Sequence, residues 1–258
     1  MSHLCLPDPR DRSLAWWKDE PACLAWWRAV TDTEAPTGLP YAVDLARLYS
    51  YSVPTPEALI ALRELGPLIE LGAGAGYWAR LLRDLGVDLV AYDIEEPSTN
   101  SWIADAPAWT KVEVGDEHSL AGHSGRTLFV SWPERPSGFM STVLDVYPPA
   151  TLVLITDGRV SVGADPLYDR LASGWEQDMA MDIPRWPGRY DSLMIWHRTD
   201  SRHPERHRRR RRASRSAGAA PKRSDEMCAT LRRRRCRDQQ PQRKPLGDIR
   251  RKFAPNAR

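Results

Sequence analysis

Three glycines and two acidic residues stand at a spacing that suits the binding of a nucleoside. An apolar run ends in a turn that contains Gly72, Gly74 and Gly76. Glu70 stands two residues before this turn, and Asp93 ends a second apolar run that follows a helix-like stretch. Glycine permits the backbone angles and the close approach that a tight loop beneath a ligand needs. An acid at the end of the second strand of such a unit can accept hydrogen bonds from ribose hydroxyl groups.

The glycine spacing distinguishes two kinds of nucleotide site. A dinucleotide-binding fingerprint reads G-x-G-x-x-G and would need glycine at position 77, where this sequence has Tyr77. The pattern present is acidic-x-G-x-G-x-G, which resembles the first motif of class I S-adenosylmethionine-dependent methyltransferases. The resemblance implies S-adenosylmethionine as the cofactor. A nicotinamide or flavin nucleotide and a decayed site remain as alternatives.

The resemblance implies roles for the residues of the turn and its flanks. The loop of Gly72, Gly74 and Gly76 is expected to curve under the methionine part of the cofactor, with Glu70 near the amino group. Asp93 is expected to hold the ribose. A structural role, such as accepting hydrogen bonds from loop amides, is the alternative for Glu70.

Two further groups complete the predicted site. By resemblance, Asp116 reaches the adenine amino group, although a solvated turn acid is an equally good interpretation, and Tyr77 is expected to pack over the cofactor. Ser131, Trp132 and Pro133 stand at the end of the fourth expected strand, where methyltransferases that act on amines carry a [D/N/S]-P-P-[Y/F/W] turn. These three are therefore the candidate catalytic residues. One proline is missing and the aromatic residue is displaced, which argues against methylation of a planar amine.

The elements that must position these residues alternate between strands and helices. The expected strands cover residues 68–71, 89–93, 111–114, 127–130, 151–155, 177–183 and 192–197. The expected helices between and before them cover residues 41–51, 56–65, 78–85, 137–147 and 165–172. This alternation predicts an α/β fold with a Rossmann-like, mostly parallel seven-stranded sheet and a terminal antiparallel hairpin. Class I methyltransferases have this layout, and the resemblance covers residues 55–198.

Four segments carry a narrower resemblance. Tyr51–Pro54, Ile69–Ala79, Ser131–Pro133 and Trp186–Gly188 look like the corresponding segments of a group of uncharacterised methyltransferase-like proteins. In that group a proline-containing entry precedes a G-A-G-x-G-Y-W-A loop, and a strand ends in C-W-P or a similar turn. This match implies no substrate, but it indicates that the two proline-containing turns belong to one architecture.

Charge divides the chain into two contrasting parts. Residues 201–258 carry 21 Lys and Arg against 5 Asp and Glu, whereas residues 1–200 carry 16 against 29. All 11 Trp and all 8 Tyr lie in residues 1–200. A highly charged segment with few large apolar residues cannot bury enough surface to offset its ordering entropy. We therefore expect a Trp-rich helical cap at 1–54, a methyltransferase-like domain at 55–200 and a disordered Arg-rich tail at 201–258.

A short repeat marks the expected cap. Leu14–Trp17 and Leu24–Trp27 both read L-A-W-W, ten residues apart. Because Pro21 stands between them, we expect two short helices rather than one continuous helix. Packing on the core is the expected use of the two Trp pairs, with stacking on an aromatic substrate as the alternative.

The Arg-rich tail admits three interpretations. Its runs Arg208–Arg212 and Arg232–Arg235 would attract RNA, DNA or acidic partners through their charge. They would equally lie against the acidic first 200 residues. Translation of a GC-rich gene in an altered frame is the third interpretation, and the abrupt change of composition slightly favours it.

Cysteine usage and hydropathy bear on the cellular setting. The four cysteines are Cys5, Cys23, Cys228 and Cys236, and no C-x-x-C motif or Cys/His cluster suggests zinc. No run approaches the length of a membrane span, and the N-terminus lacks the pattern of a signal peptide. We therefore expect no metal, no membrane insertion and a cytoplasmic location.

The function that the sequence predicts is S-adenosylmethionine-dependent methyl transfer to a small molecule or a protein side chain. The acidic first 200 residues argue against a nucleic-acid acceptor, because they would repel phosphates. A non-catalytic cofactor-binding or interaction protein on the same fold is the alternative. A NAD-dependent oxidoreductase is more distant, because Tyr77 replaces the last glycine of its fingerprint.

Overall fold

The computed structural model describes residues 6–32, 38–104, 106–133, 138–157 and 165–199. The chain divides into two units, residues 1–201 and residues 202–258. The second unit, which contains nearly all of the expected Arg-rich tail, lies outside the described residues. Disorder of the tail therefore stays a prediction, and so does the boundary of a separate cap at residue 54.

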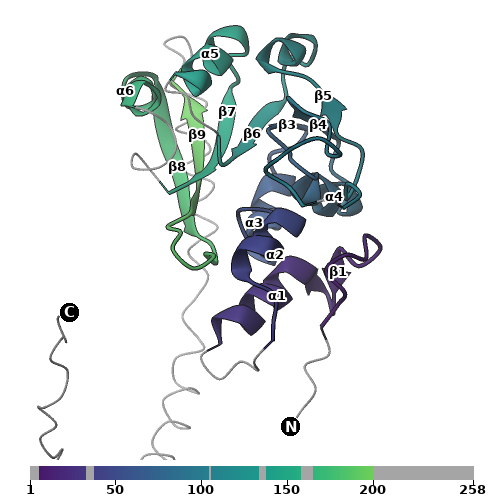
Figure 1. The fold of residues 1–258 in the computed structure, drawn as a ribbon. Helices are drawn as coiled ribbons and strands as arrows, with labels where there is room; N and C mark the ends of the chain where they lie inside the picture. Colours follow the sequence, from purple (N-terminus) through teal and green to yellow (C-terminus); the bar gives the residue numbers. More distant parts are fainter. Residues whose placement is uncertain (1–5, 33–37, 105, 134–137, 158–164, 200–258) are drawn as a thin grey trace, which may run out of the picture. The chain divides into compact units, whose positions relative to one another are not determined.

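The first unit is built around one large sheet (Figure 1). In the described residues it has seven strands in the order β5-β4-β3-β6-β7-β9-β8. The first five strands of this order pair in parallel, whereas β9 is antiparallel to both β7 and β8. The strands are β3 (Leu68–Leu71), β4 (Leu89–Asp93), β5 (Glu113–Val114), β6 (Thr127–Ser131), β7 (Thr151–Thr156), β8 (Trp175–Asp182) and β9 (Ser192–Arg198). The predicted Rossmann-like sheet with a terminal antiparallel pair is confirmed.

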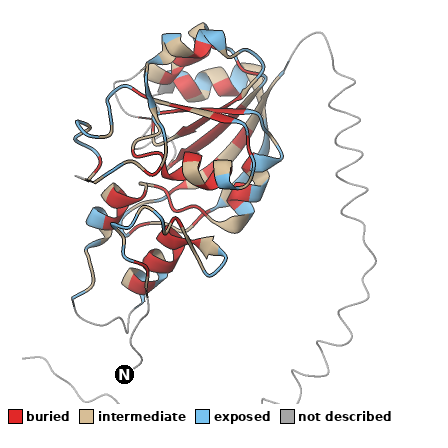
Figure 2. Ribbon diagram, turned by 90° about the vertical axis from the view of Figure 1, so that its right-hand side faces the viewer, coloured by how far each residue is buried: buried red, intermediate tan, exposed pale blue. Residues whose placement is uncertain are grey.

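Helices cover both faces of this sheet. They are α1 (Ala22–Thr31), α2 (Ala42–Leu48), α3 (Pro56–Arg63), α4 (Tyr77–Asp84), the 3-10 helix η1 (Glu117–Gly122), α5 (Phe139–Val146) and α6 (Asp165–Gly174). Alternate side chains of a strand point to opposite faces, so Leu68 and Phe129 pack with α1 to α4. Ile69 and Leu128 pack on the other face with η1, α5 and α6. Figure 2 shows the buried residues concentrated in the central strands and on the inner sides of the helices.

Helix α3 begins where the sequence indicates. The hydroxyl group of Thr55 accepts a hydrogen bond from the amide of Ala58 at 3.2 Å, which satisfies one of the free amides of the first turn. Pro56 occupies the first helical position and Glu57 lies in the first turn. The helix leads the chain into β3, the strand that precedes the glycine turn.

The first Trp pair departs from the prediction of two short helices. Strands β1 (Trp16–Trp17) and β2 (Glu20–Pro21) form a small antiparallel hairpin. Lys18 and Asp19 between them have φ of 50° and 67°, the left-handed backbone of a tight hairpin turn. The prediction is therefore wrong for the first pair, because this turn reverses the chain before a helix can start. The second pair lies in α1, as expected.

Indole groups connect the N-terminal segment to the sheet. The Nε1 of Trp27 in α1 donates to the carbonyl of Arg185, in the segment between β8 and β9, at 2.7 Å. In the reverse direction, the Nε1 of Trp186 donates to the carbonyl of Ser50 at 3.0 Å. Both indoles therefore serve packing between residues far apart in the sequence.

Three further features of the described residues concern metal binding, membrane spanning and a thiol group. Within the described ranges, no group of three or more His, Cys, Asp or Glu is arranged to hold a metal ion. No helix in that part of the chain combines the length and apolar character needed to cross a membrane. Cys23 is a buried free thiol.

Candidate functional site

The turn between β3 and α4 takes its shape from glycine. Gly72, Gly74 and Gly76 have φ of +76°, +55° and +75°, a region that other residues rarely adopt. The amides of Gly72 and Ala73 both donate to the carbonyl of Tyr92, at 2.9 and 3.0 Å. The turn is therefore held against the carboxyl end of the neighbouring strand β4.

Gly76 is required by packing as well as by its backbone angles. A Cβ atom there would lie 2.8 Å from Cγ2 of Val112 and 3.1 Å from Cγ2 of Thr110. The carbonyl of Gly76 accepts from the amide of Arg80 at 2.9 Å, which closes the first turn of α4. The segment that precedes β5 thus approaches the start of α4 to a distance that only glycine allows.

Asp93 ends β4 and binds the glycine turn directly. Its Oδ2 accepts a hydrogen bond from the amide of Gly74 at 2.7 Å. Its Oδ1 accepts from the side-chain amide of Asn100 at 3.1 Å and from the amide of Glu95 at 3.3 Å. Only 6% of Asp93 is exposed. No sequence signal marks Asn100, because an Asn in a polar loop carries no motif.

Glu70 is a buried carboxyl group with an unused acceptor. It is 2% exposed, and its Oε2 has no hydrogen-bond partner among the described residues. Burial raises the pKa of Glu70 to about 8, while the charge of Arg83 opposes this rise and that of Asp93 adds to it. Buried polar groups normally have partners. An unpartnered acceptor on the strand that enters the glycine turn is what a ligand donor would satisfy.

Asp116 lies at the neighbouring strand end but is bound differently. It caps η1, and its Oδ1 accepts from the amide of His118 at 2.9 Å. The amide of Gly115 donates to the carbonyl of Asp93 at 2.8 Å, which joins the ends of β5 and β4. Asp116 is exposed. Its side chain therefore has the local role of a turn acid, and its adenine contact stays a prediction.

Tyr77 has a structural role that the sequence did not reveal. Its hydroxyl group donates to the carbonyl of Ala15 at 2.9 Å and accepts from the amide of Cys23 at 3.0 Å. Its ring packs against those of Tyr49 and Trp109, with centroids 5.0 and 4.8 Å away, and it is 1% exposed. The hydroxyl group and the ring are thus used in contacts with the N-terminal segment. Packing of Tyr77 over the cofactor stays a prediction.

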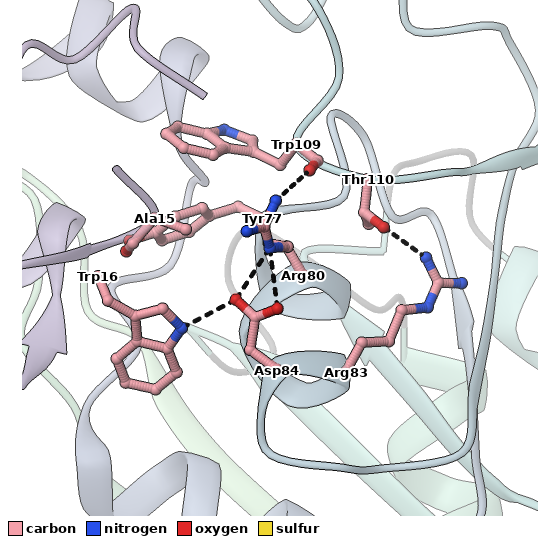
Figure 3. A network of polar contacts seen from close by, with 8 residues as sticks. All are labelled: Ala15, Trp16, Tyr77, Arg80, Arg83, Asp84, Trp109 and Thr110. Atoms are coloured by element: carbon pink, nitrogen blue, oxygen red, sulfur yellow. Dashed lines mark hydrogen bonds and ion pairs between the residues drawn. The ribbon is translucent and has the colours of Figure 1, made fainter. Parts of the chain in front are cut away.

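The polar side of α4 fixes the helix that follows the glycine turn (Figure 3). Asp84 accepts from the indole of Trp16 at 3.0 Å and pairs with Arg80 at 2.8 Å. Arg83 donates to the hydroxyl group of Thr110 at 2.9 Å. Contacts to the β1–β2 hairpin and to the segment before β5 hold α4, so the start of the helix and its turn are preorganised.

Ser131 ends β6 and belongs to a chain of three polar groups. Its hydroxyl oxygen lies 2.7 Å from that of Ser52. Ser52 is fully buried and accepts a hydrogen bond from the indole of Trp78 at 2.9 Å. If Ser52 donates to Ser131, the proton of the Ser131 hydroxyl group remains available to a ligand. Ser52 is far from Ser131 in the sequence, and no motif marks it as part of this site.

Trp132 and Pro133 follow β6 directly, at the carboxyl ends of the parallel strands. Trp132 has a φ of 55°, and its amide donates to the carbonyl of Ile155 at 2.9 Å, which places it beside the end of β7. Its buried Nε1 has no hydrogen-bond partner in the described ranges. Pro133 is buried. The three candidate catalytic residues therefore lie one strand away from β3 and its glycine turn.

A further acidic residue at the carboxyl ends of the parallel strands was missed by sequence reasoning. Asp191, immediately before β9, is fully buried, and neither of its carboxyl oxygens has a hydrogen-bond partner among the described residues. Burial raises the pKa of Asp191 to about 6, and this rise is opposed first by the neighbouring indole N–H of Trp132, which lies near the carboxyl group without meeting the geometry of a hydrogen bond. An acid between a turn and a strand gives no signal in the sequence, because its burial depends on the insertion of β9 beside β7.

Comparisons with known proteins give matches only among solved structures. No family model matches the sequence, and no curated protein matches it. The CcbJ methyltransferase from Streptomyces caelestis is 16% identical, with 67% of this chain and 96% of that chain covered and a TM-score of 0.41. The glycopeptide N-methyltransferase MtfA is 14% identical, with coverages of 62% and 97% and a TM-score of 0.41.

A third solved structure is a mutant of MtNAS in complex with S-adenosylmethionine. It is 14% identical, with 56% of this chain and 60% of that chain covered and a TM-score of 0.40. These values describe similarity and assign no activity or acceptor to this chain. Its own strand order, five parallel strands with an antiparallel strand inserted before the last, is a Rossmann-like arrangement.

Proposed function

We propose that the chain binds S-adenosylmethionine and transfers its methyl group to a small-molecule or protein acceptor. The observation that carries this proposal is the placement of Glu70, the glycine turn and Asp93 at the carboxyl ends of two adjacent parallel strands. Ligands of open α/β sheets bind beyond this edge of the sheet. The hydroxyl group of Ser131 and the indole of Trp132 lie at the end of β6, the strand that pairs with β3 on its other side.

The side chains present fit the parts of this cofactor. A carboxylate offers about four acceptor positions, and Asp93 uses three of them, which leaves one for a ribose hydroxyl group. The unpartnered Oε2 of Glu70 suits the ammonium group of the methionine part. Ile94, 72% exposed directly after Asp93, offers an apolar contact for the adenine ring. Asp116 is accessible for the adenine amino group.

The chemistry asks for alignment more than for acid–base groups. When bound, the cofactor would supply an activated methyl group on a sulfonium, so holding the acceptor in line accounts for most of the catalysis. The hydroxyl group of Ser131 and the ring of Trp132 are the residues that we propose contact the acceptor. They belong to the rigid end of β6, with Trp132 hydrogen-bonded to β7.

Calorimetric titration of the full chain with S-adenosylhomocysteine tests the cofactor. The titration is made in about 0.3 M salt, which screens the charges of the basic tail, with NAD as a parallel ligand. We expect micromolar affinity for S-adenosylhomocysteine. Asp93→Ala should weaken it tenfold or more, about 1.4 kcal/mol, because the substitution removes both the ribose acceptor and the bond to Gly74.

The matched control is Glu96→Ala, which removes an exposed acid from the same loop and should leave the affinity unchanged. Thermal denaturation of each variant verifies that it is folded. A folded protein that binds neither ligand contradicts the proposal, and preference for NAD favours the oxidoreductase alternative. Binding of S-adenosylhomocysteine without turnover across an acceptor screen favours the non-catalytic alternative.

A further inference from the structure

A guanidinium group lies against two aromatic rings next to the end of β6. Cζ of Arg189 is 4.4 Å from the ring centroid of Trp132 and 5.6 Å from that of Tyr51. Within the described ranges, this guanidinium group makes no hydrogen bond or ion pair. A cation is attracted to the face of an aromatic ring, so these two ring contacts help to hold the side chain of Arg189.

Two acidic residues lie next to each other at this end of the sheet, and one of them, Asp191, lies beside the indole of Trp132. Thr156 at the end of β7 pairs with Ser192 at the start of β9, so the next residue outward on each strand, Asp157 and Asp191, occupies the same level. Both oxygens of Asp191 and the Oδ1 of Asp157 are buried without a hydrogen-bond partner in the described part of the chain. No described cation forms an ion pair with either residue.

Electrostatic coupling shows that these groups share one environment. The raised pKa of Asp191 is caused first by burial, then opposed by the Trp132 indole and by the charge of Arg189, and Asp157 increases it. The pKa of Tyr51 is also raised by burial, and Arg47 and Arg189 oppose that rise. The charge of Arg189 therefore acts on the carboxyl group of Asp191 and on the hydroxyl group of Tyr51.

The buried carboxyl groups and the aromatic rings together suit a cationic group. Burial of a carboxyl group is costly unless it is paired, and a planar cation can stack on a ring while its N–H groups donate to carboxylates. Arg189 supplies the charge and the ring contacts but leaves the carboxyl oxygens without hydrogen bonds. We call Tyr51, Trp132, Asp157 and Asp191 the acid–aromatic cluster.

We propose that the acid–aromatic cluster is a binding site for a cationic nitrogen group, a guanidinium or ammonium, and that the side chain of Arg189 fills it until a ligand displaces it. Arg189 follows Gly188 in a turn between β8 and β9, where it is half-buried, so its side chain can leave without rearrangement of the sheet. The identification of this ligand with the methyl acceptor rests on the proposed function, whereas the cation site itself does not.

Ligand-observed NMR titration of the full chain with N-acetyl-L-argininamide tests the site, again in about 0.3 M salt. The neutral, isosteric N-acetyl-L-citrullinamide is the paired probe. Arg189→Ala should bind the arginine probe about tenfold more tightly than the unaltered chain, because the internal competitor is gone. It should show no such gain for the citrulline probe. Asp191→Asn added to Arg189→Ala should abolish the gain.

Controls separate the site from general effects of charge and folding. Arg28→Ala removes an exposed arginine that pairs with Glu20 elsewhere and should leave both probes unaffected. Arg189→Gln keeps most of the side-chain length without the charge and should reproduce the gain, so the test remains decisive if Arg189→Ala folds poorly. Butylguanidine, compared with the amide probe, distinguishes a small free cation from a peptide side chain as the ligand.

The proposal is overturned if folded Arg189→Ala and Arg189→Gln bind the arginine probe no better than the unaltered chain, or bind the citrulline probe equally well. Titration with S-adenosylhomocysteine distinguishes the two proposals. A chain that binds the arginine probe but no S-adenosylhomocysteine retains the cation site and loses the methyltransferase function. The opposite result retains the function and removes the acid–aromatic cluster as its acceptor site.

Discussion

At the residue scale, the buried carboxyl group of Glu70 contributes to the pH dependence of the free energy of unfolding. Its pKa rises from 4.5 to about 8 on folding, so the native state binds this proton more tightly than the unfolded state. The contribution is fully present below about pH 4.5 and is lost as the pH rises towards about 8, by up to about 1.4 kcal/mol per pH unit. Glu70→Gln should remove this loss, measured by urea unfolding across the same pH window.

Glu96→Gln, at an exposed acid, is the control and should keep the pH dependence of the unaltered chain. The prediction is contradicted if the free energy of unfolding of Glu70→Gln decreases with pH as steeply as that of the control. Glu70→Gln should also bind S-adenosylhomocysteine more weakly, because the variant lacks the carboxylate that we assign to the ammonium group.

At the scale of elements, the glycines on either side of α4 separate two properties of this residue, its left-handed backbone and its lack of a Cβ atom. Gly86 has a φ of +80°, and a Cβ atom there would have no neighbour within 4 Å. Gly76 has a φ of +75°, and a Cβ atom there would lie 2.8 Å from Cγ2 of Val112. Gly86→Ala should lower the free energy of unfolding by about 1 kcal/mol, the cost of the left-handed backbone. Gly76→Ala should lose about 1–3 kcal/mol more, because it also overpacks the contact. Urea unfolding measures both losses.

The same pair of variants examines the site. Gly76→Ala should weaken binding of S-adenosylhomocysteine, since the turn and α4 must shift, whereas Gly86→Ala, at the far end of that helix, should not. Equal losses of stability in the two variants would show that the contact between Gly76 and Val112 relaxes without cost.

At the scale of the whole first unit, indole hydrogen bonds connect the N-terminal segment to the sheet. Trp27→Phe and Trp186→Phe keep an aromatic ring but remove the bonds to the carbonyls of Arg185 and Ser50. Each should lower the free energy of unfolding by about 1–3 kcal/mol, because each leaves a carbonyl group without its donor. Trp102→Phe is the control at an indole that is 54% exposed, and thermal or urea unfolding compares the three.

A loss for Trp102→Phe as large as for the other two would show that ring size, rather than the hydrogen bonds, determines the effect. If all three variants retain full stability, the N-terminal segment contributes little to the fold of the sheet.

Local patterns explain why much of the fold could be predicted from the sequence. The hydroxyl cap and proline at Thr55 and Pro56 start α3 as expected, and the apolar runs became the strands of the sheet. The pair Trp16–Trp17 could not be predicted correctly, because Lys18 and Asp19 adopt a turn that their residue types do not demand. Tyr77 likewise follows the glycine turn in sequence but is bound by residues more than fifty positions away.

The sequence by itself determined the glycine turn, the acids that flank it and the order of strands and helices, because these depend on backbone angles and on neighbours within a few residues. Only the tertiary structure decided that Asp157, Asp191, Tyr51 and Arg189 gather around Trp132. Their proximity results from the insertion of β9 beside β7 and from the packing of the N-terminal segment against the sheet. Burial and electrostatic coupling between distant residues arise from that packing, so the local sequence carries no sign of them.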